Sequence, residues 1–236
     1  MTVTDGSMVA ATPMTRAATR VMVAATLASA LFLAMRYADL PWLLPVHFKS
    51  NGIPNGWQYK TLARVLMPVF VQIALGVSLG TIGALLLTRP AGTIDPDSAD
   101  ARAAAVAAEA VTVIAAIWVT FQGYAAFALV NMWTRERAGL GSAYLYFELL
   151  GIVLTGVVAT RAHARLGRPE PKPYVAEQWV FGQLYRNAAD PALFVPTRDG
   201  SRWTLNFGRP VAATLLGVII TIGVLAPTVI LAIALR

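Results

Sequence analysis

The sequence predicts an all-α membrane protein with five transmembrane helices and a small cytoplasmic loop domain, containing a β-hairpin, between helices 4 and 5. Three observations predict this class. Of the 236 residues, 57% are hydrophobic and 13% are charged, whereas a soluble domain carries about 25% charged residues. Five stretches reach the length of about 20 apolar residues that a helix needs to cross the hydrocarbon core. The segment 161–209 is too long for an unstructured connector.

The predicted spans follow long apolar runs in the chain. They cover residues 18–37, 65–87, 110–130, 144–160 and 211–235. The third belongs to a longer Ala-rich helix that begins near Ser98, a favourable N-cap residue, with Asp100 in its first turn. In the first, residues 28–30 (Ala-Ser-Ala) are similar to a signal-peptidase site. Because the apolar run continues to Met35, we expect an uncleaved helix.

The distribution of basic residues predicts the orientation in the membrane. The N-terminal flank, the 88–109 connection and residues 161–209 share one side and carry 12 of the 19 Lys and Arg residues. The positive-inside rule places this side and the N-terminus in the cytoplasm, and the C-terminus outside. The net charge of +7 then suits basic loops that face anionic lipid, and we expect no nucleic-acid partner.

This reading divides the chain into five consecutive parts. They are a cytoplasmic tail (1–17), a two-helix membrane domain (18–87) with a structured outer loop (39–60), a central helix pair (88–160), the cytoplasmic loop domain (161–209) and a C-terminal transmembrane helix (210–236). The two structured loops are expected on opposite sides of the membrane.

The outer loop is rich in turn-forming residues. Three prolines and two Asn-Gly pairs within 39–60 exclude a continuous helix. The candidate ligand-binding residues lie between the turns and are His47, Phe48, Trp57 and Lys60. Two interpretations stay open. The loop is either a compact cap whose aromatic side chains lie among lipid headgroups, or an outward-facing surface that recognises a peptide or lipid-like ligand.

The cytoplasmic loop is expected to fold after a basic, proline-containing start that suits anionic lipid. An apolar cluster is expected from Trp179, Phe181, Leu184 and Tyr185. Residues 193–195 and 202–207 are strand candidates, and residues 197–200 between them contain Asp-Gly, a strong hairpin signal.

Among the polar residues inside predicted spans, three are candidates for a functional or interhelical role. Glu148 lies in the fourth predicted span. An ionisable group at the centre of a bilayer costs about 2.5–3.5 kcal/mol of insertion free energy. Glu148 either forms an interfacial salt bridge with a neighbouring arginine or serves as a proton or cation site in an outward cavity. Gln72 and Gln122 are expected to hydrogen-bond between helices. Gly76 and Gly80 form a G-x-x-x-G pattern, which we expect to pack within the chain.

Two segments resemble uncharacterised domains of bacterial membrane proteins. In the outer loop the resemblance is carried by Pro45-Val46-His47-Phe48, Gly52-Ile53-Pro54-Asn55-Gly56-Trp57 and Lys60. In the cytoplasmic loop it is carried by Asn187, Asp190-Pro191, Phe194-Val195-Pro196, Gly200, Trp203-Thr204-Leu205-Asn206-Phe207 and Pro210. The first domain occurs in the SdpI-type immunity proteins, which protect against a sporulation-delaying toxin. The second domain is often found with the first.

The resemblance implies a multi-pass protein of the bacterial inner membrane that couples immunity against a peptide toxin to sequestration of a cytoplasmic regulator. With the two structured loops, it makes a ligand-binding immunity or signalling protein our expectation. The candidate cytoplasmic partner-binding residues are Asn187, Asp190, Trp203 and Asn206. The alternatives are a small transporter or channel subunit that uses Glu148, and a structural accessory subunit of a membrane complex.

Enzymatic chemistry is not indicated by the sequence. It contains no P-loop, no G-x-G-x-x-G after a strand and no H-E-x-x-H. Cysteine is absent and only two histidines are present, which excludes thiolate ligands, disulfides and imidazole-rich metal sites. We therefore expect no enzyme, no cofactor and no metal site.

Overall fold

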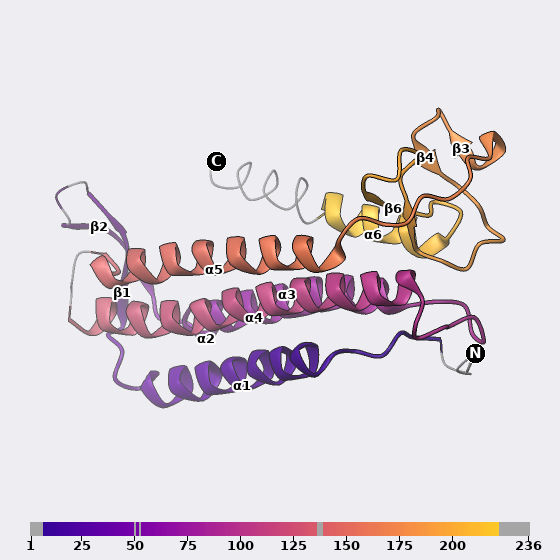
Figure 1. The fold of residues 1–236 in the computed structure, drawn as a ribbon. Coiled ribbons are helices and arrows are strands. Elements are labelled where there is room, and N and C mark those ends of the chain that lie inside the picture. Colours follow the sequence, from indigo (N-terminus) through magenta and orange to yellow (C-terminus); the bar gives the residue numbers. More distant parts are fainter. Residues whose placement is uncertain (1–6, 50, 52, 136–138, 222–236) are drawn as a thin grey trace. The chain divides into compact units, whose positions relative to one another are not determined.

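The computed structural model describes residues 7–49, 51, 53–135 and 139–221, and these are mostly helical (Figure 1). Within them, four helices are long and apolar enough to cross a membrane: α1 (Pro13–Arg36), α3 (Met67–Leu87), α4 (Ala99–Thr134) and α5 (Ser142–Leu166). Four of the five predicted spans are thereby confirmed as helices. The fifth begins as α6 (Pro210–Ile220), and its remainder lies outside the described residues.

Short elements connect the helices. The described strands form three antiparallel pairs: β1 (Leu43–Phe48) with β2 (Pro54–Tyr59), β3 (Trp179–Val180) with β4 (Leu184–Tyr185), and β5 (Phe194–Pro196) with β6 (Trp203–Leu205). Two short helices are α2 (Leu62–Val65) and the 3-10 turn η1 (Ala176–Gln178). The hairpin predicted within residues 161–209 is confirmed as β5–β6. The outer loop, for which the sequence predicts only turns, is also a hairpin.

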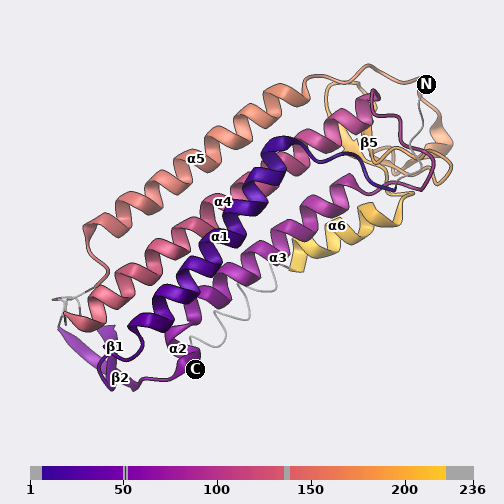
Figure 2. The same ribbon diagram turned by 90° about the horizontal axis from the view of Figure 1, so that it is seen from below.

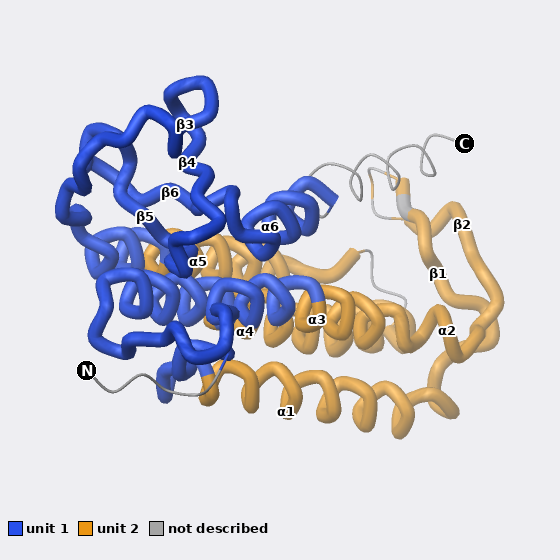
Figure 3. Tube along the Cα trace, turned by 90° about the vertical axis from the view of Figure 1, so that its right-hand side faces the viewer, with its two compact units in different colours: residues 1–15, 78–112, 159–236 blue, residues 16–77, 113–158 orange. Residues whose placement is uncertain are grey.

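The chain divides into two compact units (Figure 3). Unit 1 comprises residues 1–15, 78–112 and 159–236, and unit 2 comprises residues 16–77 and 113–158. Each unit is therefore assembled from segments that are distant in the sequence. Helices α3, α4 and α5 contribute residues to each unit, and each unit has its own buried apolar cluster.

In unit 2 the buried cluster joins α1, the hairpin, α3 and the C-terminal part of α4. Its members are Leu33, Leu40, Leu44, Val65, Val69, Ala126, Val130, Met132 and Trp133. Figure 2 shows β1–β2 next to α2 and the C-terminal end of α1. The base of the outer hairpin is thus packed on buried apolar side chains, because Leu44 of β1 is itself fully buried.

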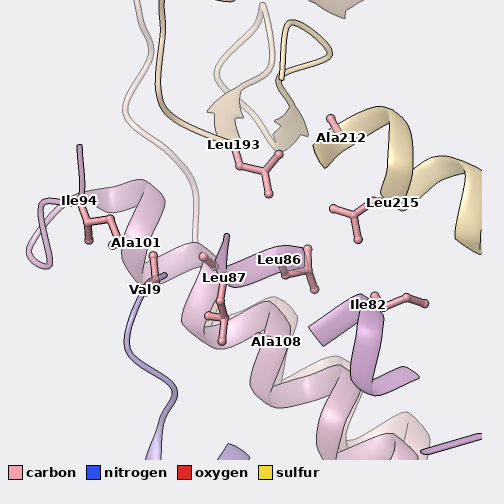
Figure 4. Packing of buried hydrophobic residues seen from close by; sticks show 11 residues of the cluster. Val9, Ile82, Leu86, Leu87, Ile94, Ala101, Ala108, Leu193, Ala212 and Leu215 are labelled. Atoms are coloured by element: carbon pink, nitrogen blue, oxygen red, sulfur yellow. The ribbon is translucent and has the colours of Figure 1, made fainter. Parts of the chain in front are cut away.

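In unit 1 the loop domain and α6 pack on the ends of α3 and α4 (Figure 4). The cluster comprises Val9, Ile82, Leu86, Leu87, Ile94, Ala101, Ala104, Ala108, Leu193, Ala212 and Leu215. Ala101, Ala104 and Ala108 recur at intervals of three and four residues, so they form one face of α4. Small side chains on this face leave room for the larger Leu193 and Leu215.

The N-terminal segment is part of unit 1 rather than a separate tail. Helix α1 starts at Pro13, five residues before the predicted position. Before it, the Val9 amide donates to the Leu87 carbonyl at 2.8 Å, and the Arg89 amide donates to the Ser7 carbonyl at 2.9 Å. At the start of α4, the Ala101 amide donates to the Ser98 hydroxyl at 3.1 Å, which confirms the predicted N-cap.

Candidate functional site

The outer-loop candidates belong to the β1–β2 hairpin, whose base is fixed by two side chains. The indole Nε1 of Trp133 donates to the Pro45 carbonyl at 3.2 Å. The Lys60 ammonium donates to the carbonyl oxygens of Tyr37 and Leu40, each at 2.9 Å, and lies 4.8 Å from the centre of the Tyr37 ring. These carbonyls follow the C-terminal end of α1, where a cation is favourable. Lys60 therefore anchors the hairpin to α1.

His47 is held in place by its neighbours on β2. Its Nδ1 lies 2.5 Å from the Asn55 Oδ1, and Gly56 is its partner across the hairpin. A Cβ added at Gly56 would lie 2.9 Å from the His47 Cβ, closer than side chains pack. The strand register shifts on either side of His47. Such a shift is typical of a β-bulge, which changes the direction of a side chain. Phe48 follows in β1, and its side chain lies outside the described part.

Large aromatic side chains are exposed on this hairpin. Trp42, Trp57 and Tyr59 are 68%, 54% and 65% exposed. Trp57 and Tyr59 alternate along β2 and therefore share a face, and the Trp42 ring meets the Tyr59 ring edge-on at a centroid distance of 6.5 Å. Within the described residues β2 pairs with β1 alone. The hairpin thus presents an exposed edge strand with aromatic residues, a surface on which an extended chain can pair.

We expect Lys60→Met to loosen the hairpin base. The variant loses two charge-assisted hydrogen bonds, each worth about 1.5–3 kcal/mol, while the apolar contacts of Trp133 remain. Hydrogen exchange should accelerate at least tenfold in residues 37–60. The matched control is Lys49→Met, because Lys49 is exposed on the same hairpin and its side chain makes no described contact. Equal exchange in the two variants would contradict the anchoring role.

Gln72 joins three helices of unit 2, as the sequence predicts. Its Nε2 donates to the Ser29 hydroxyl of α1 at 3.0 Å and to the Val119 carbonyl of α4 at 2.9 Å. The side chain is 1% exposed, and its Oε1 has no hydrogen-bond partner among the described residues. A Cβ at Gly123 would lie 3.1 Å from the Ser29 hydroxyl, so glycine permits this close approach. The interhelical role of Gln72 is confirmed.

We expect Gln72→Leu to change the free energy of unfolding by about 1 kcal/mol or less. Each lost interhelical bond is worth about 0.6 kcal/mol in a membrane, and the unpaired Oε1 is removed with them. Gln72→Ala should cost about 2–5 kcal/mol, because it leaves a cavity. Thermal unfolding in detergent measures the two variants. A Leu variant as unstable as the Ala variant would show that the polar contacts, and not the packing, stabilise this site.

Glu148 and Gln122 form no described hydrogen bond with Gln72, and the interhelical bond expected of Gln122 is not found among the described residues. Each is half-buried and makes no hydrogen bond or ion pair within the described residues. The sequence predicts Arg36, Arg135 and Arg137 on the same side of the membrane as Glu148. Arg36 pairs instead with Asp39 at 3.4 Å, and Arg135 makes no ion pair within the described residues. Arg137 lies outside the described residues.

The packing expected at Gly76 and Gly80 is not found among the described residues. A Cβ at either position would meet no described atom within 4 Å. The close glycine contact is one turn further on, at Gly83, where a Cβ would lie 3.0 Å from the Thr112 hydroxyl of α4. Residues 76–80 also match G-x-S-x-G, but they lie inside α3 and not on the strand-to-helix turn that a nucleophile elbow requires.

The loop-domain candidates form an internal network around Asn206, which is fully buried. Its Nδ2 donates to the carbonyls of Asn187, Asp190 and Ala192 at 2.8, 3.1 and 3.1 Å. Its Oδ1 accepts from the amides of Asn187 and Gly208 at 3.0 and 2.9 Å. A single side chain thus hydrogen-bonds to the backbone of four residues of the loop domain, at positions 187, 190, 192 and 208. Asn206 has no exposed surface to offer a partner.

The other loop-domain candidates are also engaged internally. The Asp190 carboxylate accepts from the Tyr185 hydroxyl at 3.1 Å, and burial raises the pKa of that hydroxyl. The indole of Trp203 donates to the Leu166 carbonyl at 3.2 Å, which ties β6 to the end of α5. The Trp203–Leu166 bond joins residues 37 positions apart, so no local sequence signal indicates it.

A buried ion pair joins the loop domain to the helix ends of unit 1. The Arg89 guanidinium, 5% exposed, donates to the Asp100 carboxylate through Nε at 2.6 Å and Nη2 at 2.8 Å. Asp100 also accepts from the amides of Leu193 and Phe194 at 3.1 and 2.7 Å. The sequence predicts Asp100 only as a first-turn acid of α4. The structure shows that Asp100 also accepts hydrogen bonds from the backbone at the start of β5.

Phe181 departs from the predicted apolar cluster. Trp179 and Tyr185 do pack, with their rings 5.3 Å apart and edge-on, but Phe181 is 92% exposed at the turn between β3 and β4. Its φ of 53° is in the left-handed region, which is uncommon for a bulky residue. An exposed aromatic side chain at the tip of a tight turn is a feature that sequence periodicity does not reveal.

Within the described residues, no group of three His, Asp or Glu side chains gathers as a metal site would. Comparisons of the chain with protein-family models, curated proteins and solved structures give no match. The resemblance to the SdpI-type immunity proteins therefore stays a prediction that rests on the motifs.

Proposed function

We propose that the protein is a bacterial inner-membrane receptor of the immunity or signalling type, similar to the SdpI-type proteins, whose outer hairpin binds a peptide. The observation that carries this proposal is the exposed strand β2, with Trp57 and Tyr59 on one face and Trp42 beside them. Aromatic residues of this kind dominate binding energy at protein interfaces. The four apolar helices support a membrane protein.

A peptide suits this surface better than a lipid-like ligand. The Pro45 carbonyl of β1 accepts from Trp133, so this edge of the hairpin faces α4, and β2 forms the other edge. An extended peptide can add to such an edge through backbone hydrogen bonds, with alternate side chains against Trp57 and Tyr59. A lipid has no backbone to pair in this way. We therefore assign an extended peptide with apolar side chains at alternate positions.

The proposed orientation places the hairpin outside and residues 161–209 in the cytoplasm, with the C-terminal segment as a fifth span. The absence of cysteine makes a direct test possible. In intact cells, we expect Ile53→Cys to react with a membrane-impermeant maleimide and Ser201→Cys to react only after lysis. Both positions are exposed. Labelling of Ser201→Cys in intact cells would reverse the orientation and remove the hairpin from the outer surface.

On the cytoplasmic side we assign Phe181, rather than the buried Asn206, to contact with a regulator. Phe181 is the most exposed large apolar side chain of the loop domain. The left-handed backbone at this position holds the ring away from the β3–β4 pair. An apolar group presented on a rigid tip is suited to a pocket on a partner protein.

Site-specific photocross-linking in native membranes tests the two proposed contacts. A photoreactive phenylalanine analogue replaces Trp57, Phe181 or, as the control, Val153 of α5, which is 60% exposed in an apolar helix. We expect a peptide adduct at position 57, a cytoplasmic protein adduct at 181 and lipid adducts alone at 153. Lipid adducts alone at position 57 would instead make the hairpin an interfacial cap.

A further inference from the structure

An open cavity of about 850 Å³ lies within unit 1. It is formed by the first turn of α4, the end of α5, residues 168–172 and the loop domain. Its volume is in the range of small-molecule sites. Four basic side chains line it, those of Arg102, Arg165, Arg168 and Lys172, against two acidic ones, Asp100 and Glu170. The lining is therefore cationic.

Two of the cations are available to a ligand. Arg165 pairs with Glu109, and the Lys172 Nζ lies 3.4 Å from the Asp190 carboxylate. Arg102 and Arg168 are exposed and make no ion pair or side-chain hydrogen bond within the described residues. Neither can be neutralised by Asp100, because Arg89 and two backbone amides already engage that carboxylate.

Another part of the lining is apolar. It includes Leu166, Phe194, Pro196 and Trp203, and the bond from the Trp203 indole to the Leu166 carbonyl fixes the indole ring. Cationic and apolar surfaces thus meet in one cavity. A ligand that fills it carries a negatively charged group next to a carbon-rich one.

The position along α4 indicates the depth of the cavity in the membrane. If residues 110–130 cross the hydrocarbon core, Arg102 lies about 12 Å beyond the start of that span, at 1.5 Å per residue. The polar headgroup layer extends about 5–8 Å from the core, and an arginine side chain reaches back over the remaining distance. The cavity is therefore close to phospholipid phosphates.

We propose that this cavity binds a phosphate ester, with Arg102 and Arg168 on the phosphate oxygens and the carbon-rich part against Trp203 and Phe194. Guanidinium groups bind phosphate in a two-pronged geometry that lysine lacks. The phosphate belongs either to an anionic phospholipid or to a soluble phosphate monoester. This site is independent of the peptide-binding hairpin.

Native mass spectrometry of the delipidated full-length protein tests the proposal. The probes are phosphatidylglycerol, phosphatidylcholine and glycerol 3-phosphate. Arg102→Gln/Arg168→Gln should weaken phosphatidylglycerol binding about thirtyfold, at about a factor of five for each arginine near a lipid surface. The matched control, Arg186→Gln/Arg202→Gln, removes the same charge from exposed loop-domain positions outside this cavity and should change binding less than threefold.

The outcomes separate the two sources of phosphate. Binding of phosphatidylglycerol alone, with the expected loss, supports a lipid headgroup site. Binding of glycerol 3-phosphate with the same dependence on Arg102 and Arg168 supports a soluble ester. Equal losses in the two double variants, unchanged binding in the cavity variant, or no phosphate binding by the wild type would overturn the proposal.

Discussion

The Asn206→Ala variant is expected to lose the folded loop domain while the membrane helices stay intact. Asn206 is the only described side chain that bonds to the backbone of residues 187, 190, 192 and 208 together. Its removal leaves several buried polar groups unpaired, each at a cost of about 1–3 kcal/mol. The total exceeds the 4–5 kcal/mol that marks an exceptional substitution.

Limited proteolysis and hydrogen exchange of residues 176–209 measure this effect. We expect cleavage in the loop domain of the variant at protease levels that leave the wild type intact. Thr204→Ala is the matched control, because Thr204 lies two residues away in β6, is half-buried and has no described side-chain bond. Equal protease resistance of the Asn206 variant and the Thr204 control would contradict the structural role of Asn206.

The second large effect is expected at the buried ion pair. Asp100→Ala removes the bidentate partner of Arg89 and the acceptor of the Leu193 and Phe194 amides. Breaking a buried pair from one side costs about 3–5 kcal/mol, because a charge stays buried without compensation. The loop domain should then separate from α4, with faster hydrogen exchange at the start of β5.

A double-mutant cycle with Arg89→Met separates the ion pair from the backbone bonds. The Arg89→Met/Asp100→Ala variant should be more stable than Asp100→Ala alone, since no buried charge is then uncompensated. It should remain less stable than the wild type, because the amides of Leu193 and Phe194 still lack their acceptor. Additive effects of the two substitutions on the unfolding free energy would show that the pair contributes no coupling.

The parts of the fold that depend on local chemistry could be predicted from the sequence. Apolar runs gave four of the helices, Ser98 was identified as an N-cap, and Asp-Gly indicated the β5–β6 hairpin. At that hairpin the hydroxyls of Ser201 and Thr197 bond to Asp199 and hold the pKa of this carboxyl well below its usual range. The turn signal and its stabilising contacts thus lie within five residues of each other.

The parts that depend on distant contacts could not be predicted. The prolines of the outer loop indicate turns, yet Pro45 lies inside β1, where its carbonyl is satisfied by Trp133, 88 residues later in the chain. Lys60 was expected to bind a ligand, and its ammonium instead bonds to backbone beyond the end of α1. Residue type alone does not distinguish a cation that is free to bind a ligand from one that already hydrogen-bonds within the protein.

The division into two compact units also depends on contacts between residues that are distant in the sequence. The sequence predicts parts that follow one another along the chain, whereas each compact unit combines segments from several of them. In unit 1, Val9 and Leu193 are buried in one cluster, although more than 180 positions separate them in the sequence. Hydropathy patterns identify which residues are buried and not which of them meet.

Peptide binding by the β1–β2 hairpin is tested most directly by capture of the ligand from native membranes with the wild type and with a His47→Ala/Trp57→Ala variant. Capture uses chemical cross-linking, and mass spectrometry identifies bound peptides and proteins. The control variant is Lys49→Ala/Gln58→Ala, which changes two exposed side chains of the same hairpin and keeps its aromatic residues. Lys60→Met is not used here, because it alters the hairpin base.

We expect the wild type and the control to capture an extracytoplasmic peptide and the His47/Trp57 variant to lose it. Cytoplasmic partners should be captured equally by all three proteins, since the loop domain is unchanged. If the His47/Trp57 variant captures the same peptides as the wild type, the hairpin is a cap at the membrane surface and the receptor proposal fails.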